Sequence, residues 1–265
     1  MSSPGEVWSL GDYPAIARDV LAPLGPELVA ACGIGPAMRV LDVGTGTGNA
    51  AIAAALSGAD VVALDPAPGL MEVGRAEAER REVHITWVEG DAEALPLGDA
   101  EFDAVLSCLG AMFAHDHEAT AAELARVCRP GGTIGLVAWE PGGVAAELMR
   151  VTARYAPPPP PGAGSPIAWG DETHVRALFG DRISAIESHM GVVRSERYTD
   201  PEALARFYRE SFGPAVALAR RLDPQAVAAL HADIGAWART ALRTHAGGRP
   251  GLELEYVLSV ARRSG

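Results

Sequence analysis

Apolar and polar positions between Arg39 and Trp139 follow two alternating patterns along the chain. Short runs of consecutive apolar residues, typical of buried strands, are separated by longer segments in which apolar residues recur at helical spacing. This alternation predicts βαβ units and a parallel sheet covered by helices. The expected strands are Arg39–Val43, Ala59–Leu64, His84–Val88, Phe102–Ser107 and Thr133–Trp139, and the expected helices are Asn49–Ser57, Leu70–Glu79 and Asp116–Cys128.

The pattern is looser on both sides of this stretch, which divides the chain into three parts. Residues 1–35 contain short helical pieces interrupted by prolines, and this favours a lid over a core element. Residues 36–140 form the predicted ligand-binding core. Residues 141–265 are expected to complete the sheet and to carry a helical insertion at about residues 200–246, which would cap the substrate.

The last third of the chain mixes strand and helix signals. Strands are expected over Ile183–Val193 and Leu252–Val260, and helices rich in alanine, leucine and arginine over Pro201–His245. Pro157–Pro161 predicts a stiff polyproline segment. This segment is either a surface connector or a rigid wall beside the substrate entrance.

Composition narrows the class of protein. The 265 residues are 48% hydrophobic and 21% charged, as in ordinary globular chains. The 22 basic residues, all arginine, face 34 acidic residues and leave a net charge of -12, which disfavours a nucleic-acid partner. The chain has no apolar run long enough for a membrane span and no signal-peptide pattern at its start, so we expect a cytoplasmic protein. The three cysteines are too far apart to suggest a zinc site or a disulfide framework.

A glycine-rich loop provides the first chemical signal. Gly44, Gly46 and Gly48 alternate with threonines between the first expected strand and its helix. Backbone without Cβ atoms can lie against a ligand, and the helix that follows offers unpaired N–H groups. The spacing is G-T-G-T-G and not the G-x-G-x-x-G of dinucleotide-binding loops. The loop therefore indicates a cofactor site with no clear place for a pyrophosphate.

Two acidic residues follow the next two strands. Asp65 ends the second strand, where a carboxylate can accept hydrogen bonds from both hydroxyls of a ribose. Asp91 follows the third strand and could accept the exocyclic amine of adenine. A single acid at a strand end is more commonly a solvated loop residue or a helix cap. Together with the glycine loop, however, the acids on successive strands indicate a nucleoside-type cofactor.

Four segments carry a resemblance to a known family: LDVGTGTGNAA, VVALDPAPGLMEVGR, EGDAEALPLGDAEFDAVLS and ELARVCRPGGTIGLVAW. By these segments, roughly Trp8 to Trp139 resembles a class I S-adenosylmethionine-dependent methyltransferase related to the ubiquinone and menaquinone C-methyltransferases. The resemblance implies a Rossmann-like α/β fold with helices on both faces of a seven-stranded, mostly parallel sheet. The last strand of that sheet would be antiparallel, and S-adenosylmethionine would be the cofactor.

The resemblance also implies the cofactor-binding residues. The three glycines would flank the methionine and ribose parts of the cofactor, Asp65 would bind the ribose, and Asp91 with the Ala92 N–H would bind the adenine. Ser107 and Cys108 would lie under the methionine part. The segment from Trp8 to Tyr13 resembles one in which an aromatic residue closes over the cofactor, although it could equally pack a helix onto the core. The implied cofactor-binding set is Tyr13, Asp42, Gly44, Thr45, Gly46, Gly48, Asp65, Pro66, Asp91, Ala92, Glu93 and Ser107.

Methyl transfer from a sulfonium depends mainly on alignment of donor and acceptor, so a strong base is not obligatory. If the acceptor is a phenol or an alcohol, a positioned histidine could take its proton. His115 and His117 are the candidate bases, because they follow the fourth strand near the carboxyl edge of the sheet. Asp116 between them can be a helix N-cap, with both histidines solvated. Adjacent side chains point apart, so no metal site is expected.

The predicted activity is methyl transfer to a small-molecule acceptor at oxygen, nitrogen or carbon. Two alternatives remain open from the sequence. One is an enzyme that keeps the cofactor as a structural or electrostatic element while it catalyses a cyclisation or an elimination. The other is a non-catalytic cofactor-binding partner. A serine hydrolase is disfavoured because the chain lacks a G-x-S-x-G elbow. No nucleic-acid or membrane partner is expected, and the sequence leaves the oligomeric state open.

Overall fold

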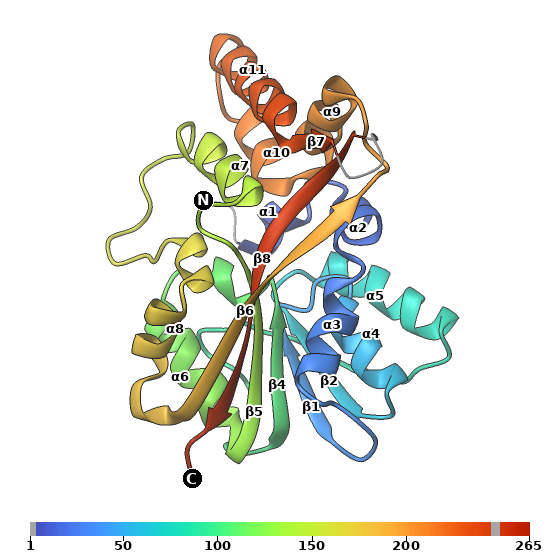
Figure 1. Ribbon diagram of the computed structural model, residues 1–265, viewed down its shortest axis with the longest axis vertical. Helices are drawn as coiled ribbons and strands as arrows, with labels where there is room; N and C mark the ends of the chain where they lie inside the picture. The colour runs from blue at the N-terminus through green and yellow to red at the C-terminus, as the bar shows by residue number, and fades with distance from the viewer. Residues whose placement is uncertain (1–3, 245–249) are drawn as a thin grey trace.

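The computed structural model describes residues 4–244 and 250–265, which are built around one twisted sheet (Figure 1). Its main path has the order β3-β2-β1-β4-β5-β8-β6, and β7 pairs with β8 outside this path. Strands β1 to β5 are mutually parallel, whereas β8 runs antiparallel to both of its neighbours, β5 and β6. The strands are β1 (Arg39–Val43), β2 (Asp60–Asp65), β3 (Thr86–Glu89), β4 (Phe102–Cys108), β5 (Cys128–Trp139), β6 (Ile183–Ser195), β7 (Leu242–Thr244) and β8 (Pro250–Arg263).

The predicted Rossmann-like fold class is confirmed, including the antiparallel last strand. The extra strand β7 was not predicted, because its residues fall in the range expected to be helical. Helix α11 ends at Ala241, and Leu242 and Thr244 then pair with Leu252 and Pro250 of β8. Their backbone hydrogen bonds thus go to a strand. Two parts of the predictions lie outside the described residues. They are residues 1–3 of the predicted lid and residues 245–246 of the predicted insertion, which include His245.

Helices cover both faces of the sheet, with α3 and α4 packed together on one face and α6 and α8 on the other (Figure 1). Aspartate side chains cap α2, α6, α8, α9 and α11 by accepting backbone N–H groups of the first turn. The helices are α1 (Pro4–Trp8), α2 (Tyr13–Ile16), α3 (Leu24–Ala31), α4 (Asn49–Leu56), α5 (Pro68–Arg80), α6 (His117–Val127), α7 (Val144–Ala153), α8 (Glu172–Phe179), α9 (Pro201–Ser211), α10 (Gly213–Ala219) and α11 (Pro224–Ala241). Short turns of other helical types are Ala17–Leu21, Ala111–Phe113, Pro166–Gly170 and Gly180–Arg182.

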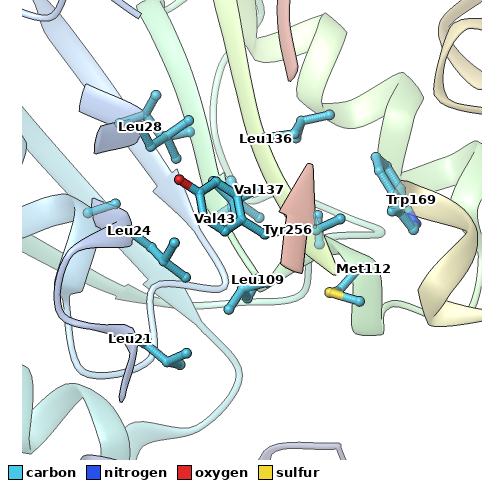
Figure 2. Packing of buried hydrophobic residues seen from close by; sticks show 14 of the residues in the cluster. Leu21, Leu24, Leu28, Val43, Leu109, Met112, Leu136, Val137, Trp169 and Tyr256 are labelled. Carbon is cyan, nitrogen blue, oxygen red and sulfur yellow. The ribbon is translucent and has the colours of Figure 1, made fainter. Parts of the chain in front are cut away.

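The apolar core lies between the sheet and these helices (Figure 2). Leu24 and Leu28 lie one helical turn apart on α3 and have no exposed surface. They face the core together with Val43 of β1 and Leu136 of β5 (Figure 2). Burial of each such leucine stabilises the fold by about 1.5 to 3 kcal/mol. The second half of residues 1–35 is therefore packed into the core.

The remaining helices gather at the carboxyl end of the sheet. In Figure 1, α7, α9, α10 and α11 lie above this end, and α1 and α2 lie between them and the sheet. Helix α1 packs against α10, and α2 packs against α5 and α9. The first two helices thus bridge the sheet and the group of helices above it. No helix in residues 4–244 or 250–265 is long and apolar enough to cross a membrane.

Candidate cofactor and acceptor site

A pocket opens at the carboxyl ends of β1, β2 and β4, where open parallel sheets bind their ligands. We call it the main pocket. Its wall includes nine of the residues that the sequence singled out: Tyr13, Gly44, Gly46, Asp65, Pro66, Asp91, Ala92, Glu93 and His115. The other wall residues are Trp8, Leu64, Leu70, Leu109, Gly110, Phe113 and Ala114. The structure therefore brings most of the predicted site residues together.

The glycine loop is in backbone contact with the loop that follows β4. Gly44 has a φ of +66°, and a Cβ placed on it would lie 2.6 Å from the Cα of Gly110. Both the left-handed conformation and the close approach require glycine at this position. At Gly46, which has a φ of +53°, a Cβ would lie 3.3 Å from Cε1 of Tyr13. The loop thus presents bare backbone to the main pocket beside the Tyr13 ring.

The carboxylate of Asp65 is buried at the base of the main pocket. Its Oδ2 accepts the Gly46 N–H at 2.7 Å, and its Oδ1 accepts the Ala67 N–H at 2.8 Å. Burial raises the pKa of Asp65 to about 6, although both backbone hydrogen bonds act against this rise. Each carboxylate oxygen keeps a further lone pair for a ligand hydroxyl.

Asp42 lies below the glycine loop and lines a small cavity that Tyr13 and Cys108 also line. Its Oδ2 accepts hydrogen bonds from the Thr45 hydroxyl at 2.6 Å and from the Ala51 N–H at 3.0 Å. Its Oδ1 is buried without a hydrogen-bond partner among the described residues. Burial raises the pKa of Asp42 to about 7. An orphaned carboxylate oxygen of this kind is suited to a cationic ligand group.

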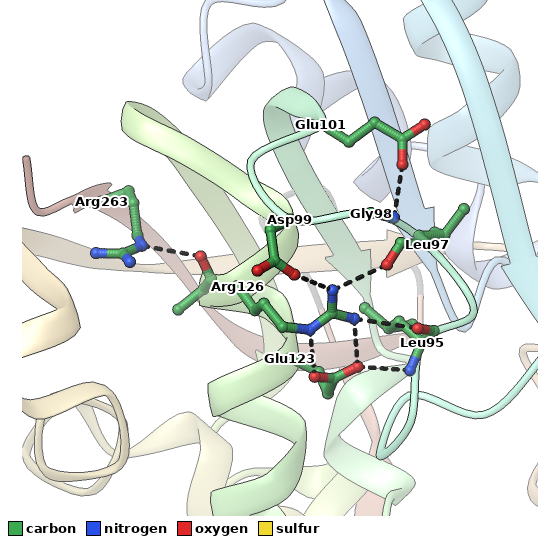
Figure 3. Close-up of polar contacts among 9 residues, drawn as sticks. Leu95, Leu97, Gly98, Asp99, Glu101, Glu123, Arg126 and Arg263 are labelled. Atoms are coloured by element: carbon green, nitrogen blue, oxygen red, sulfur yellow. Dashed lines mark hydrogen bonds and ion pairs between the residues drawn. The ribbon is translucent and has the colours of Figure 1, made fainter.

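The loop after β3 carries the predicted adenine-binding residues and is held by two sets of hydrogen bonds. Asp91 Oδ1 accepts the Glu93 N–H at 3.0 Å, and Glu93 Oε1 accepts the backbone N–H groups of His115 and Asp116. Arg126 of α6 holds the following part of the loop by donating to the backbone carbonyls of residues 95 and 97 (Figure 3). The same guanidinium pairs with Glu123 and Asp99. The loop that bears Asp91 and Glu93 is thus fixed at both ends.

A second, apolar pocket adjoins the main pocket, and Trp8, Tyr13, Leu109 and Phe113 line both. We call it the apolar pocket. The Trp8 ring lies edge-on to Phe113, with their centroids 4.5 Å apart. The rest of its wall comes from α2 and the turn after it, from β5, α7, α9, the α9–α10 junction, α11 and β8. These residues are Ile16, Leu21, Trp139, Ala145, Leu148, Met149, Tyr208, Phe212, Trp237 and Leu254.

Four residues implied to bind the cofactor do not line the main pocket: Asp42, Thr45, Gly48 and Ser107. Asp42 and Thr45 line the small cavity below the glycine loop instead. The Ser107 hydroxyl donates to the Val43 carbonyl at 2.6 Å and accepts the Ala111 N–H at 2.8 Å. The Ser107 hydroxyl thus links the end of β1 to the turn that follows β4. Gly48 begins α4, and a Cβ on it would point at the Trp87 ring, 2.8 Å away.

The two candidate bases have different surroundings. His115 is exposed and lines the main pocket, whereas His117 is buried and lies outside it. The His117 Nδ1 lies 3.1 Å from Nε2 of His174, and its ring meets Trp169 edge-on. Asp116 caps α6 by accepting the Ala119 N–H at 2.9 Å. The alternative in which Asp116 is a helix N-cap is thus the one that the structure shows. This helix start turns His117 away from both the main and the apolar pockets.

Several pocket residues were not singled out from the sequence. Tyr208, Phe212 and Trp237 lie in the range predicted as helices, yet nothing in the sequence placed them beside Trp8. The available signal was the aromatic content of an otherwise alanine-rich and leucine-rich insertion. Gly110 is a second such residue, because its contact with Gly44 depends on the neighbouring positions of β1 and β4.

Comparisons with known proteins agree with this geometry. Residues 41–136 match the methyltransferase domain family. The chain is 41% identical over 260 residues to an uncharacterized protein of Mycobacterium tuberculosis, covering 97% of this chain and 93% of that protein. It is 42% identical over 107 residues to the demethylmenaquinone methyltransferase of Renibacterium salmoninarum, covering 40% of this chain and 44% of that enzyme. The crystal structure of the YcgJ protein from Bacillus subtilis has a TM-score of 0.61 at 19% identity, covering 91% of this chain and 98% of that one.

The fold, the site and these matches define a class of enzyme. The chain belongs to the class I S-adenosylmethionine-dependent methyltransferases and is related to the quinone C-methyltransferases. The site fits the cofactor that this class implies: the buried orphan oxygen of Asp42 suits the ammonium of its methionine part, and the Asp65 carboxylate suits hydroxyl groups.

Proposed function

We propose that the enzyme methylates a small, largely apolar molecule bound in the apolar pocket. The observation that carries this proposal is the shared wall of Trp8, Tyr13, Leu109 and Phe113 between the two pockets. Because the same four residues line both pockets, ligands bound in the two pockets would lie next to each other, with their reacting groups close together. Concave, aromatic-lined pockets with few polar groups are the usual form of small-molecule sites.

The main pocket, together with the small cavity that Asp42 lines below the glycine loop, would hold the cofactor. Asp42 would accept from the ammonium, Asp65 from the ribose hydroxyls, and Asp91 with the Ala92 N–H would bind the adenine. When bound, S-adenosylmethionine supplies a methyl group on a sulfonium, which passes to the acceptor as the carbon–sulfur bond breaks and leaves S-adenosylhomocysteine. Trp8 and Tyr13 would exclude water from the junction of the two pockets.

Alignment of the acceptor would be the main contribution of the apolar pocket. Among the residues that the structure describes, no carboxylate, imidazole or guanidinium lines this pocket. His115 lines only the main pocket of the two, and His117 lines neither. Holding two reactants about 3 to 3.5 Å apart can by itself lower the barrier by about 7 to 11 kcal/mol.

The test is to incubate the full chain with S-adenosylmethionine and a library of aromatic, terpenoid and amine compounds. We expect S-adenosylhomocysteine to form in equal amount to a product that has gained one methyl group. An acceptor that is converted without S-adenosylhomocysteine would support the cyclisation or elimination alternative. S-adenosylhomocysteine binding with no turnover of any compound would support the non-catalytic partner.

Filling the apolar pocket should block the acceptor and spare the cofactor. Ala145 on α7 is buried and lines only the apolar pocket of the two, so Ala145→Phe adds a ring where the acceptor would bind. Overpacking costs about 1 to 3 kcal/mol, and we expect kcat/KM for the best acceptor to fall by about tenfold or more. The Kd of S-adenosylhomocysteine, measured by calorimetry, should stay close to that of the wild type. Ala229→Phe on the exposed face of α11 is the matched control. Unchanged kcat/KM in Ala145→Phe would place the acceptor elsewhere.

Cofactor binding should become tighter as pH rises from about 5 to about 7.5. The pKa values of Asp42 and Asp65 are raised to about 7 and about 6, so both groups are largely protonated in the ligand-free protein near pH 5 and lose their protons as the pH rises to about 7.5. A cationic ammonium beside Asp42 favours the carboxylate, so binding releases a proton, and affinity rises with pH until both groups are ionised. Calorimetric titration of S-adenosylhomocysteine at several pH values measures this slope. Asp42→Asn should flatten it, and an affinity that falls with rising pH would contradict the assignment.

A further inference from the structure

The polar groups of the apolar pocket are all uncharged. They belong to three tryptophans and two tyrosines among its wall residues: Trp8, Trp139, Trp237, Tyr13 and Tyr208. The Trp237 N–H is already used, because it donates to the Val144 carbonyl at 2.9 Å. Tyr13 also lines the main pocket and is shared with the cofactor. Within residues 4–244 and 250–265, Tyr208 therefore carries the one side-chain hydroxyl that lines the apolar pocket without lining the main pocket.

Tyr208 is well positioned but has no hydrogen-bond partner. It comes from α9, and its ring meets those of Trp237 and Phe212 edge-on, with centroids 4.9 Å and 6.4 Å apart. Only 5% of the residue is exposed, and its hydroxyl makes no hydrogen bond with any described residue. Burial raises the pKa of Tyr208, so the hydroxyl stays protonated and remains a donor at neutral pH. The hydroxyl oxygen is not one of the fully buried polar atoms that lack a partner, so it keeps some accessible surface. A ligand that covers this oxygen without a hydrogen bond would lose free energy, and an oxygen acceptor on the ligand removes that loss.

The charge of the pocket also limits its ligand. A protonated amine would find no carboxylate in the wall of the apolar pocket, and it would lie beside the positive sulfonium of the cofactor. Like charges in a weakly polar environment repel strongly, and an unpaired buried charge is costly. A neutral or anionic oxygen meets neither penalty, and it can accept a hydrogen bond from a neutral donor.

We infer that Tyr208 selects the acceptor by donating a hydrogen bond to an oxygen on an unsaturated ring compound, and that the pocket disfavours aliphatic amines. This inference rests on the proposed function, since it assumes that the apolar pocket is the acceptor site. Tyr208 then acts as a specificity-determining residue. The surrounding rings of Trp139, Phe212 and Trp237 supply the apolar contact, and the hydroxyl fixes the orientation of the ring.

The test uses three fluorinated probes and the full chain saturated with S-adenosylhomocysteine. The probes are a fluoronaphthol, the matching fluoronaphthalene and the matching fluoronaphthylmethylamine, and fluorine NMR titration gives the Kd of each. We expect the wild type to bind the naphthol about 2- to 10-fold more tightly than the hydrocarbon, and the amine most weakly. Tyr208→Phe should remove the preference for the naphthol and leave the Kd of the hydrocarbon unchanged.

Tyr155→Phe is the matched control, because it removes a hydroxyl that donates to Asp233 outside both pockets. Tyr155→Phe should keep the wild-type ratio between the Kd of the hydrocarbon and the Kd of the naphthol. Three results would overturn the inference: an unchanged ratio in Tyr208→Phe, tightest binding of the amine, or binding of none of the probes. The ranking by the wild type needs no variant, so it tests the cost of burying an unpaired ammonium even if Tyr208→Phe folds poorly.

Failure of the proposed function gives a different pattern. If no compound yields S-adenosylhomocysteine but Tyr208→Phe still abolishes the naphthol preference, the pocket recognises the oxygen without methyl transfer. If an acceptor is methylated and Tyr208→Phe leaves both its KM and the probe ratio unchanged, only the role of Tyr208 is wrong.

Discussion

Gly44→Ala is expected to weaken S-adenosylhomocysteine binding by about 100-fold or more. Two effects combine at this residue. Its φ of +66° costs an alanine about 1 to 2 kcal/mol, and its new Cβ would lie 2.6 Å from the Cα of Gly110. Neither atom belongs to a flexible side chain, so the loop after β1 and the loop after β4 must move apart. Both loops line the main pocket, and the movement would change its shape.

Gly33→Ala is the control that separates these two effects. Gly33 has nearly the same φ, +64°, but a Cβ there would meet no atom within 4 Å. Backbone strain should cost both variants a similar amount of stability, and chemical unfolding should show a larger total loss for Gly44→Ala because its Cβ also displaces the two loops. Calorimetry should show near-normal S-adenosylhomocysteine affinity for Gly33→Ala only. Equal affinities of the two variants would mean that the contact with Gly110 does not shape the site.

The parallel half of the fold could be predicted because its strands are short, mainly apolar runs separated by segments with helical spacing and by glycine and proline. The boundaries were less certain where pairing overrides the local signal. β5 begins at Cys128, five residues before the predicted Thr133, because Cys128 pairs with Phe102 ahead of an irregularity in the ladder. Pro130 and the two glycines after it read as a loop, yet they lie within this strand.

The main pocket could be predicted because its residues are local to strand ends. Parallel strands bring their carboxyl ends to one edge, so Gly44, Asp65 and Asp91 meet without any knowledge of long-range packing. His117 shows the limit of this reasoning. It is two residues from His115, but it begins a helix, and the rotation of the helix carries its side chain toward His174.

The apolar pocket could not be predicted because its wall joins parts of the chain about 200 residues apart. The rings of Trp8 and Phe212 meet edge to face with their centroids 5.9 Å apart. The sequence around each residue contains no signal that predicts this contact. They meet because α1, which ends at Trp8, packs against α10, which Phe212 precedes. Under our proposal the acceptor binds in this part of the molecule, which would explain why the sequence indicates the cofactor more clearly than the acceptor.

Asp65→Ala is expected to weaken S-adenosylhomocysteine binding by about 1.5 to 3 kcal/mol, or about 10- to 150-fold, if the carboxylate accepts the ribose hydroxyls. The variant also removes the acceptor of the Gly46 and Ala67 N–H groups, which hold the glycine loop against the turn after β2. Asp65→Asn separates these contributions, because its amide oxygen can still accept one N–H. It should recover part of the affinity at neutral pH.

Asp103→Ala provides the matched control for Asp65→Ala. Asp103 also accepts a backbone N–H, that of Arg39 at 2.7 Å, but it does not line the main pocket. Loss of this carboxylate should lower stability without changing the Kd of S-adenosylhomocysteine. If Asp65→Ala binds the ligand as tightly as Asp103→Ala does, Asp65 serves only to hold the loop. The cofactor must then be positioned by the backbone of the glycine loop and by Asp42, whose orphaned oxygen would become the next carboxylate to test.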